Sequence, residues 1–137
     1  KPATVYFQTY ENNSKMISEI TNENPDIFLD RELEIRKKNK LPPYQRFISL
    51  ILTGENENKL EKEAFNFKNF IENKIEGKIL GPVNAPLFRL KKKFRIRFLV
   101  RGSKSMKMQN SLAKIIPKYK FSSGIKLSVD VDPINFN

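Results

Sequence analysis

The chain contains no cysteine and no histidine among its 137 residues. Without cysteine it forms no disulfide and has neither a thiolate metal site nor a cysteine nucleophile. Without histidine it lacks the commonest general base and metal ligand of proteins. These two absences remove the residue types on which many active sites are built, so the composition points away from an independent enzyme.

Long apolar runs are missing as well. No stretch approaches the roughly 20 apolar residues of a membrane span, and no signal-peptide pattern opens the chain. Together with the absence of cysteine, this predicts a cytoplasmic protein with no membrane partner. Because the chain starts at Lys1 rather than at methionine, we expect it to be a fragment of a longer protein.

Acidic residues are absent from a large part of the sequence. Residues 77–129 hold 14 lysines and arginines and no aspartate or glutamate, whereas residues 1–76 hold 12 basic and 13 acidic residues. The net charge of +11 therefore arises from one half of the chain. Positive charge at this density repels itself on a compact surface, which favours a polyanionic partner.

The basic half contains a stretch with a period of two. Residues 94–101 read Phe-Arg-Ile-Arg-Phe-Leu-Val-Arg, which predicts a strand with an apolar face and a cationic face. The arginines of such a strand would position phosphates, and the lysines just before it would add mobile, non-specific charge. The plainer alternative is a solvated basic surface without a ligand. The predicted DNA-binding residues are Arg89, Lys91, Lys92, Lys93, Arg95, Arg97 and Arg101.

Strand and helix patterns alternate after the stop signal Leu41-Pro42-Pro43, which ends a helix expected from Asn24 to about Lys40. From residue 44 the predicted order is β-α-β-β-α-β, an α+β fold with a four-stranded antiparallel sheet and two helices on one face. The predicted strands are 46–53, 78–80, 94–101 and 125–131, and the predicted helices are 58–75 and one that Ser103 caps and Pro117 ends.

The first 43 residues are expected to form a separate part of the chain. Residues 4–9 predict a short strand that belongs to a sheet lying mostly elsewhere, and helices follow it. On the far face of the main sheet, Phe47, Ile51 and Leu99 are apolar, so we expect part of that face to be covered.

Short motifs along the whole chain match a known family. The most distinctive are Gly81-Pro82-Val83-Asn84-Ala85-Pro86 and the closing Val129-Asp130-Val131-Asp132-Pro133. With Pro42-Pro43-Tyr44 and Phe94-Arg95 in the same order and spacing, the sequence resembles the C-terminal end of primosomal protein N′ (PriA), the bacterial replication-restart DNA helicases. It departs from them at Lys91-Lys92-Lys93-Phe94-Arg95, where the family has Arg-Gly-x-Tyr-Arg, and so loses a glycine and a tyrosine hydroxyl.

The resemblance implies a domain organisation and a function for the parent protein. Residues 1–43 would be the end of the second helicase lobe and its connection, and residues 44–137 a C-terminal DNA-binding and docking domain, similar in fold to a small-subunit ribosomal protein. The parent would be an ATP-dependent 3′→5′ helicase that uses ATP, Mg²⁺ and Zn²⁺ and restarts replication with other primosome proteins at DNA forks. The phosphate-binding loop, acidic box and zinc-binding cysteines are absent here, so we expect no catalytic site and no cofactor in this chain.

The resemblance also implies a second site, at the start of the last helix. In the family, the acidic C-terminal tail of single-stranded DNA-binding protein docks there, at positions that match Ser105 and Gln109. The family's arginine falls at Ser105, so Lys104 or Lys107 would have to replace it. Helix N-terminal amides favour a carboxylate as well. The domain is then either a DNA-binding module or a protein-interaction module that receives this tail without contacting DNA, and an ordinary surface helix is the plainer alternative.

Two further patterns have simple interpretations. Asp130 and Asp132 share a face of the last strand, but no other ligand type accompanies them, so pairing with nearby cations is favoured over a metal or acid–base site. Phe65, Phe67 and Phe70 are expected in the core rather than on a base-stacking platform, because they lie on a helix.

Overall fold

The computed structural model describes residues 2–11, 15–21 and 25–133. By its internal contacts the chain divides into two compact units, Lys1–Asn39 and Lys40–Asn137. Within the described residues, no helix is long and apolar enough to cross a membrane. The elements are α1 (Lys15–Thr21), α2 (Pro25–Lys38), β1 (Arg46–Gly54), α3 (Glu57–Ile71), β2 (Lys78–Leu90), β3 (Lys93–Gly102), α4 (Lys107–Ile115), the 3₁₀-helix η1 (Ile116–Lys118) and β4 (Lys126–Val131).

The first unit consists of α1, α2 and an N-terminal segment. An ion pair between Glu19 and Arg31 joins the two helices. Pro25 is the first residue of α2, while the predicted cap Asn24 lies outside the described residues. Residues 2–9 form no strand with any described part of this chain, since no sheet edge pairs with them. Their assignment to a helicase lobe therefore stays a prediction.

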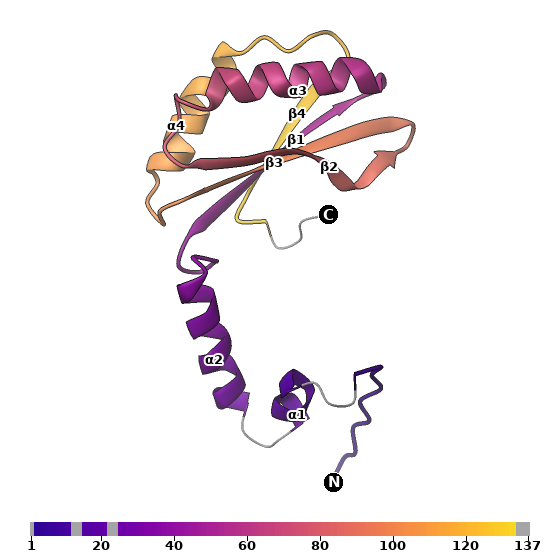
Figure 1. Ribbon diagram of the computed structural model, residues 1–137, viewed down its shortest axis with the longest axis vertical. Helices are drawn as coiled ribbons and strands as arrows, with labels where there is room; N and C mark the ends of the chain where they lie inside the picture. Colours follow the sequence, from indigo (N-terminus) through magenta and orange to yellow (C-terminus); the bar gives the residue numbers. More distant parts are fainter. Residues whose placement is uncertain (1, 12–14, 22–24, 134–137) are drawn as a thin grey trace. The chain divides into compact units, whose positions relative to one another are not determined.

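The second unit is built on a four-stranded antiparallel sheet in the order β2-β3-β1-β4. Figure 1 shows α3 and α4 on the same side of this sheet. In the centre, Leu50 of β1 lies opposite Phe98 of β3 and Val129 of β4. These features confirm the α+β fold with two helices on one face that the β-α-β-β-α-β order predicts.

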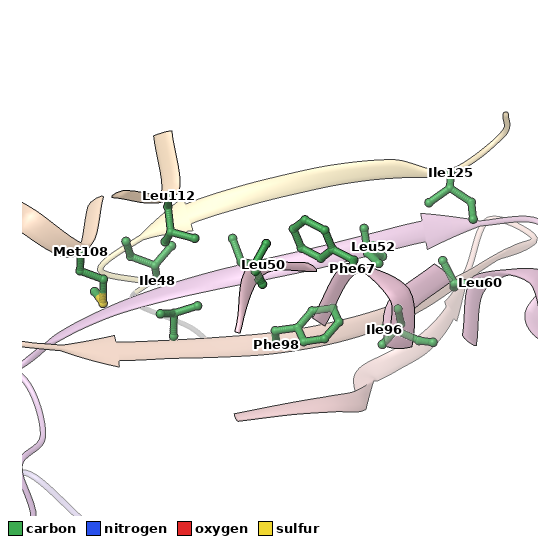
Figure 2. Close-up of a cluster of buried hydrophobic side chains, with 13 residues drawn as sticks. Ile48, Leu50, Leu52, Leu60, Phe67, Ile96, Phe98, Met108, Leu112 and Ile125 are labelled. Carbon is green, nitrogen blue, oxygen red and sulfur yellow. The ribbon is translucent and has the colours of Figure 1, made fainter. Parts of the chain in front are cut away.

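The hydrophobic core lies between the sheet and these helices (Figure 2). Leu50, Phe67 and Phe98 are fully buried, and the rings of Phe67 and Phe98 meet edge to face with centroids 6.0 Å apart. Burying a side chain of this size stabilises the fold by roughly 1.5–3 kcal/mol relative to leaving it exposed. Because successive residues of a strand point to opposite sides, this core fixes which face every other residue of β1 and β3 occupies.

Strand β2 is longer than predicted. It runs from Lys78 to Leu90 rather than ending at residue 80, because its pairing with β3 continues past Gly81-Pro82 through two irregularities. Gly81 has φ +101°, and a Cβ there would lie 2.8 Å from the carbonyl oxygen of Arg97. Only glycine combines this conformation with so close an approach between the strands.

Helix α4 begins later than predicted. Its first residue is Lys107, and no side chain caps it, because the preceding residue Met106 is itself in a helical conformation. Ser103, the predicted cap, instead shares a hydrogen bond of 2.8 Å with the hydroxyl of Ser105. The segment 103–105 is therefore an exposed connection rather than a first helical turn.

Helix α3 presents one apolar stripe to the sheet. Phe67 is buried and Phe70 is partly buried against the core, as predicted. Phe65 is 59% exposed, so its assignment to the core was wrong. Its position, one residue from Ala64 and two from Phe67, turns it away from the stripe that those residues form.

Candidate nucleic-acid interface

The side of the sheet away from α3 and α4 carries the arginines of β3, and we call it the arginine face. Along β3, Ile96, Phe98 and Val100 are buried, and the residues between them have intermediate exposure. The alternation of a strand therefore places Arg95, Arg97 and Arg101 together on the arginine face, as the two-residue period predicts.

The two edge strands, β2 and β4, add two more cations to this face. Lys78 of β2 lies opposite Arg101, and Lys126 of β4 lies opposite Thr53, which in turn lies opposite Arg95. Neither lysine was among the predicted site residues. The alternation of residues 125–131 already indicates the side on which Lys126 lies, whereas the register between β2 and β3 brings Lys78 to this face. Asp130, opposite Ser49, is the one acidic residue that the described strands place here.

Electrostatic repulsion acts between these cations. Residues two apart in a strand are separated by about 6.6 Å along it. That is shorter than the Debye length of about 8 Å at physiological ionic strength, so salt screens the repulsion only in part. A polyanion lying along β3 would relieve it, and the planar guanidinium groups suit bidentate contacts with phosphate oxygens.

Apolar side chains lie among these charges. Phe47 of β1 is buried, whereas Leu80 and Val83 of β2 are 39% and 52% exposed. Phe47 is therefore covered, whereas Ile51 and Leu99 keep intermediate exposure. That another part of the protein covers the rest of this face stays a prediction.

The turn between β2 and β3 carries a second group of basic residues. Leu90 pairs with Lys93, so the turn consists of Lys91 and Lys92 alone, with φ angles of 49° and 65°. The Nζ of Lys93 lies 4.0 Å from a carboxylate oxygen of Glu55, which is a weak pair because the Glu55 side chain is 79% exposed.

Arg89 lies apart from the other predicted DNA-binding residues. It pairs with Phe94, whose side chain packs against the core, so Arg89 lies on the helix side of the sheet. Its guanidinium carbon is 5.4 Å from the centroid of the Phe94 ring, a cation–π distance. The structure therefore separates Arg89 from the arginine face.

The predicted tail-binding residues lie at the end of the sheet where α4 begins. Lys104, Ser105 and Lys107 are exposed. The side-chain oxygen of Gln109 accepts a hydrogen bond of 3.3 Å from Nη1 of Arg46, so Gln109 is already engaged. No local pattern marks Arg46, since it is a residue at the start of a strand that meets Gln109 only through the fold.

A shallow hollow of about 240 Å³ adjoins this site. Lys104 and Arg46 supply its positive charge, and prolines and Phe47 supply its apolar wall. Its lining is Pro42, Pro43, Gln45, Arg46, Phe47, Lys104, Asp132 and Pro133.

The two aspartates at the end of the chain do not form a pair. Asp132 follows β4 with φ 54°, and its carboxylate lies 3.1 Å from Nε of Arg46. This confirms that Asp132 pairs with a neighbouring cation. Within residues 2–11, 15–21 and 25–133, no group of three or more aspartates and glutamates is placed to hold a metal ion.

Comparison with known proteins supplies the family. Residues 37–134 match the family model described as "Primosomal protein N C-terminal domain". The chain is similar to proteins named "Replication restart protein PriA": 35% identical over 96% of its length to one from Rickettsia typhi, 30% over 100% to one from Synechocystis, and 25% over 97% to one from Bacillus subtilis. It spans about one fifth of the length of these relatives, 20%, 16% and 17% respectively. The chain therefore belongs to the primosomal protein N C-terminal domain family.

Proposed function

We propose that this domain is the C-terminal DNA-binding and docking module of a replication-restart helicase. The observation that carries the proposal is the arginine face, where six cations from three strands, Lys93 of β3 included, accompany one acid. The names of the relatives supply the context of replication restart. The remainder of such a protein would contribute the ATP-dependent 3′→5′ helicase activity with its Mg²⁺ and Zn²⁺, and the adjacent faces of this domain would dock the helicase lobe and other primosome proteins.

In this proposal the phosphate backbone of fork or single-stranded DNA lies along β3. Arg95 and Arg97 hold phosphates from a rigid strand, and Lys91 and Lys93 extend the contact into the hairpin. Recognition follows charge and shape rather than sequence, since backbone contacts carry no base information. Neutralising four to six phosphates of a single strand predicts a log–log salt slope of roughly −3 to −4.

Fluorescence anisotropy of the 137-residue chain with single-stranded and forked DNA, across a salt series, tests the proposal. The variant Arg95→Glu/Arg97→Glu should lose binding and most of the salt dependence. The matched control, Lys114→Glu/Lys118→Glu, makes the same charge change at exposed residues of α4 and η1 and should bind within about twofold of the unmodified chain. If the chain binds no DNA at low salt, or if both double variants lose binding equally, the proposal fails.

The second candidate is a protein-interaction module that binds the acidic tail of single-stranded DNA-binding protein without contacting DNA. The basic and apolar hollow beside Lys104 favours it, because an acidic tail needs both kinds of contact. A fluorescent acidic peptide should then bind, and Lys104→Glu/Lys107→Glu should abolish that binding. If the chain binds the acidic peptide but does not bind DNA, the protein-interaction function is the correct one.

A further inference from the structure

A hollow of about 280 Å³ opens on the arginine face beside the β2–β3 hairpin. The hairpin forms one wall, and β1 and β4 form the floor, where Ile51 lies opposite Ser128. The volume is just below the range of small-ligand sites, which begins at roughly 300 Å³. The lining residues are Ile51, Thr53, Leu90, Lys91, Lys93, Arg95 and Ser128.

The rim of this hollow is cationic. Lys91, Lys93 and Arg95 stand around it. Among the residues that the structure describes, the one acid in an ion pair with them is the highly exposed Glu55, 4.0 Å from Lys93. The hollow beside α4 is different, because there Arg46 is matched by Asp132 at 3.1 Å. The positive charge at the hairpin hollow is thus only weakly compensated, which favours an anionic ligand.

The interior of the hollow is not suited to phosphate alone. Ile51 is partly exposed and Leu90 is 45% exposed, so they offer apolar surface to a ligand. The hydroxyls of Thr53 and Ser128 have no hydrogen-bond partner among the described residues, and both remain available to a polar edge. A ligand that satisfies the whole hollow has a flat, partly apolar body with polar edges and carries a phosphate.

The hairpin turn adds a separate argument. Lys91 and Lys92 both have positive φ in a two-residue turn, where asparagine and glycine are favoured because side chains are strained there. The chain therefore keeps two lysines where their backbone conformation is unfavourable. Strain of this kind at a ligand site is a recognised signature of function over stability.

We infer that this hollow binds one unpaired nucleotide of a DNA strand, with the base against Ile51 and Leu90 and the phosphate on Lys91, Lys93 and Arg95. This inference rests on the proposed function and adds to it a preference for single-stranded over duplex DNA. In a duplex the bases are stacked inside, so only the phosphates could reach the rim. An unpaired nucleotide can place its base in the hollow and its phosphate on the basic rim.

A comparison of two probes tests the inference. One is a thymidine strand of about 12 nucleotides, within the usual range of single-strand sites, and the other is an abasic strand with the same phosphates. Base–aromatic stacking is worth about 1–3 kcal/mol per base, and an aliphatic floor belongs at the lower end, which is about fivefold in affinity. The 137-residue chain should therefore bind the thymidine strand about fivefold more tightly.

The variant Ser128→Leu fills the floor without changing the charge. It should lose the preference for bases and still bind the abasic strand as the unmodified chain does. The control Ser123→Leu makes the same substitution at an exposed turn residue outside the hollow and should keep the preference. A preference that persists in Ser128→Leu would overturn the inference, because the bases would then bind elsewhere.

The failures of the two proposals are distinguishable. Equal, salt-dependent affinity for both probes would overturn the nucleotide hollow and leave the DNA-binding function standing. No binding of either probe at low salt would overturn both. Lys91→Asn/Lys92→Gly should weaken binding of both probes at least about fourfold at physiological salt. Undiminished binding by that variant would contradict the role of the hairpin.

Discussion

Nε of Arg46 lies 3.1 Å from Oδ2 of Asp132, which joins the first residue of β1 to the turn after β4. The same guanidinium donates a hydrogen bond of 3.3 Å to Gln109 in α4. The backbone N–H of Asp132 also donates to the carbonyl oxygen of Phe47 at 2.8 Å. One arginine thus connects three segments that are far apart in the sequence, next to the predicted tail-binding residues.

We expect Arg46→Met to lower the free energy of unfolding by about 1–2 kcal/mol, because it removes the ion pair with Asp132 and the hydrogen bonds that the guanidinium donates to Gln109 and to the sulfur of Met106, at a partly exposed site. Asp132→Asn should cost less, about 0.5–1 kcal/mol, since the amide oxygen can still accept from Arg46. Urea denaturation of each single variant and of the double variant checks this. Strictly additive losses would contradict a direct interaction.

The hairpin turn predicts a gain in stability. Lys91→Asn/Lys92→Gly replaces two residues at positive φ by the pair that a two-residue turn of this kind prefers. We expect the free energy of unfolding to rise by about 1–2 kcal/mol. Differential scanning calorimetry measures this change. A lower melting temperature would contradict the prediction, because it would mean that these two lysines stabilise the fold although they lie in an exposed turn.

The contribution of Lys78 and Lys126 follows from the strand register. If DNA lies along the arginine face, Lys78→Gln and Lys126→Gln should each make the log–log salt slope shallower by about 0.7 for a single strand. A salt series with each variant measures the slope. Lys62→Gln in α3, on the other side of the sheet, is the matched control and should leave it unchanged. If neither Lys78→Gln nor Lys126→Gln changes the salt slope, the DNA contacts β3 but not β2 or β4.

Gly81→Ala should be costly. Its Cβ would lie 2.8 Å from the carbonyl oxygen of Arg97 at φ +101°, so strain and a backbone clash add together. We expect a loss of about 2–4 kcal/mol in the free energy of unfolding. Gly124→Ala is the control, because φ is also positive there (+84°) but nothing lies within 4 Å of the new methyl group. Equal losses for the two variants would mean that the clash contributes nothing.

Alkaline pH should destabilise the domain through Tyr119. Burial first, then the charge of Glu63 and a hydrogen bond to it, raises the pKa of Tyr119 from 10.0 to about 12. The neutral phenol is therefore favoured in the fold, so its contribution is complete below pH 10 and is lost as pH rises from 10 to 12. After allowance for solvent at this partly exposed ring, we expect a loss of about 1–2 kcal/mol.

The comparison between the unmodified chain and Tyr119→Phe isolates this effect, because lysines titrate in the same range. Urea denaturation at several pH values between 9 and 12 should show a steeper decline for the unmodified chain. Glu63→Gln should lower the pKa of Tyr119, since it removes the neighbouring charge. Parallel declines in the unmodified chain and Tyr119→Phe would contradict the prediction.

Local patterns in the sequence predicted most of the fold. Alternation over residues 94–101 predicted both faces of β3, and Gly54 and the helical stripe that follows it predicted β1 and α3 within a few residues. These predictions succeed because the period of the apolar residues is set by the element itself. The start of α4 was missed, because Ser103 resembles a cap but bonds to Ser105 instead.

The candidate site was predictable only in part. The basic strand could be read from its own alternation, but Arg89 could not be placed, since the irregularities of β2 change which side a residue faces. Alternation indicates the face of Lys126, but no local pattern marks Lys78 or Arg46 as part of the site. Their neighbours are set by strand register and by the meeting of distant segments.

By itself, the sequence determined the order of the elements, the charged and apolar sides of β3, and the acid-free half that supplies the charge. The tertiary structure alone decided which cations share a face, which ones pair with acids, and that a hollow lies between the hairpin and the floor of the sheet. The physical reason is the sequence distance over which each kind of information acts. Periodicity depends on a few neighbouring residues, whereas a site is assembled from strands that pair across long sequence separations. In such a sheet, one extra residue in a strand reverses the side that its side chains occupy.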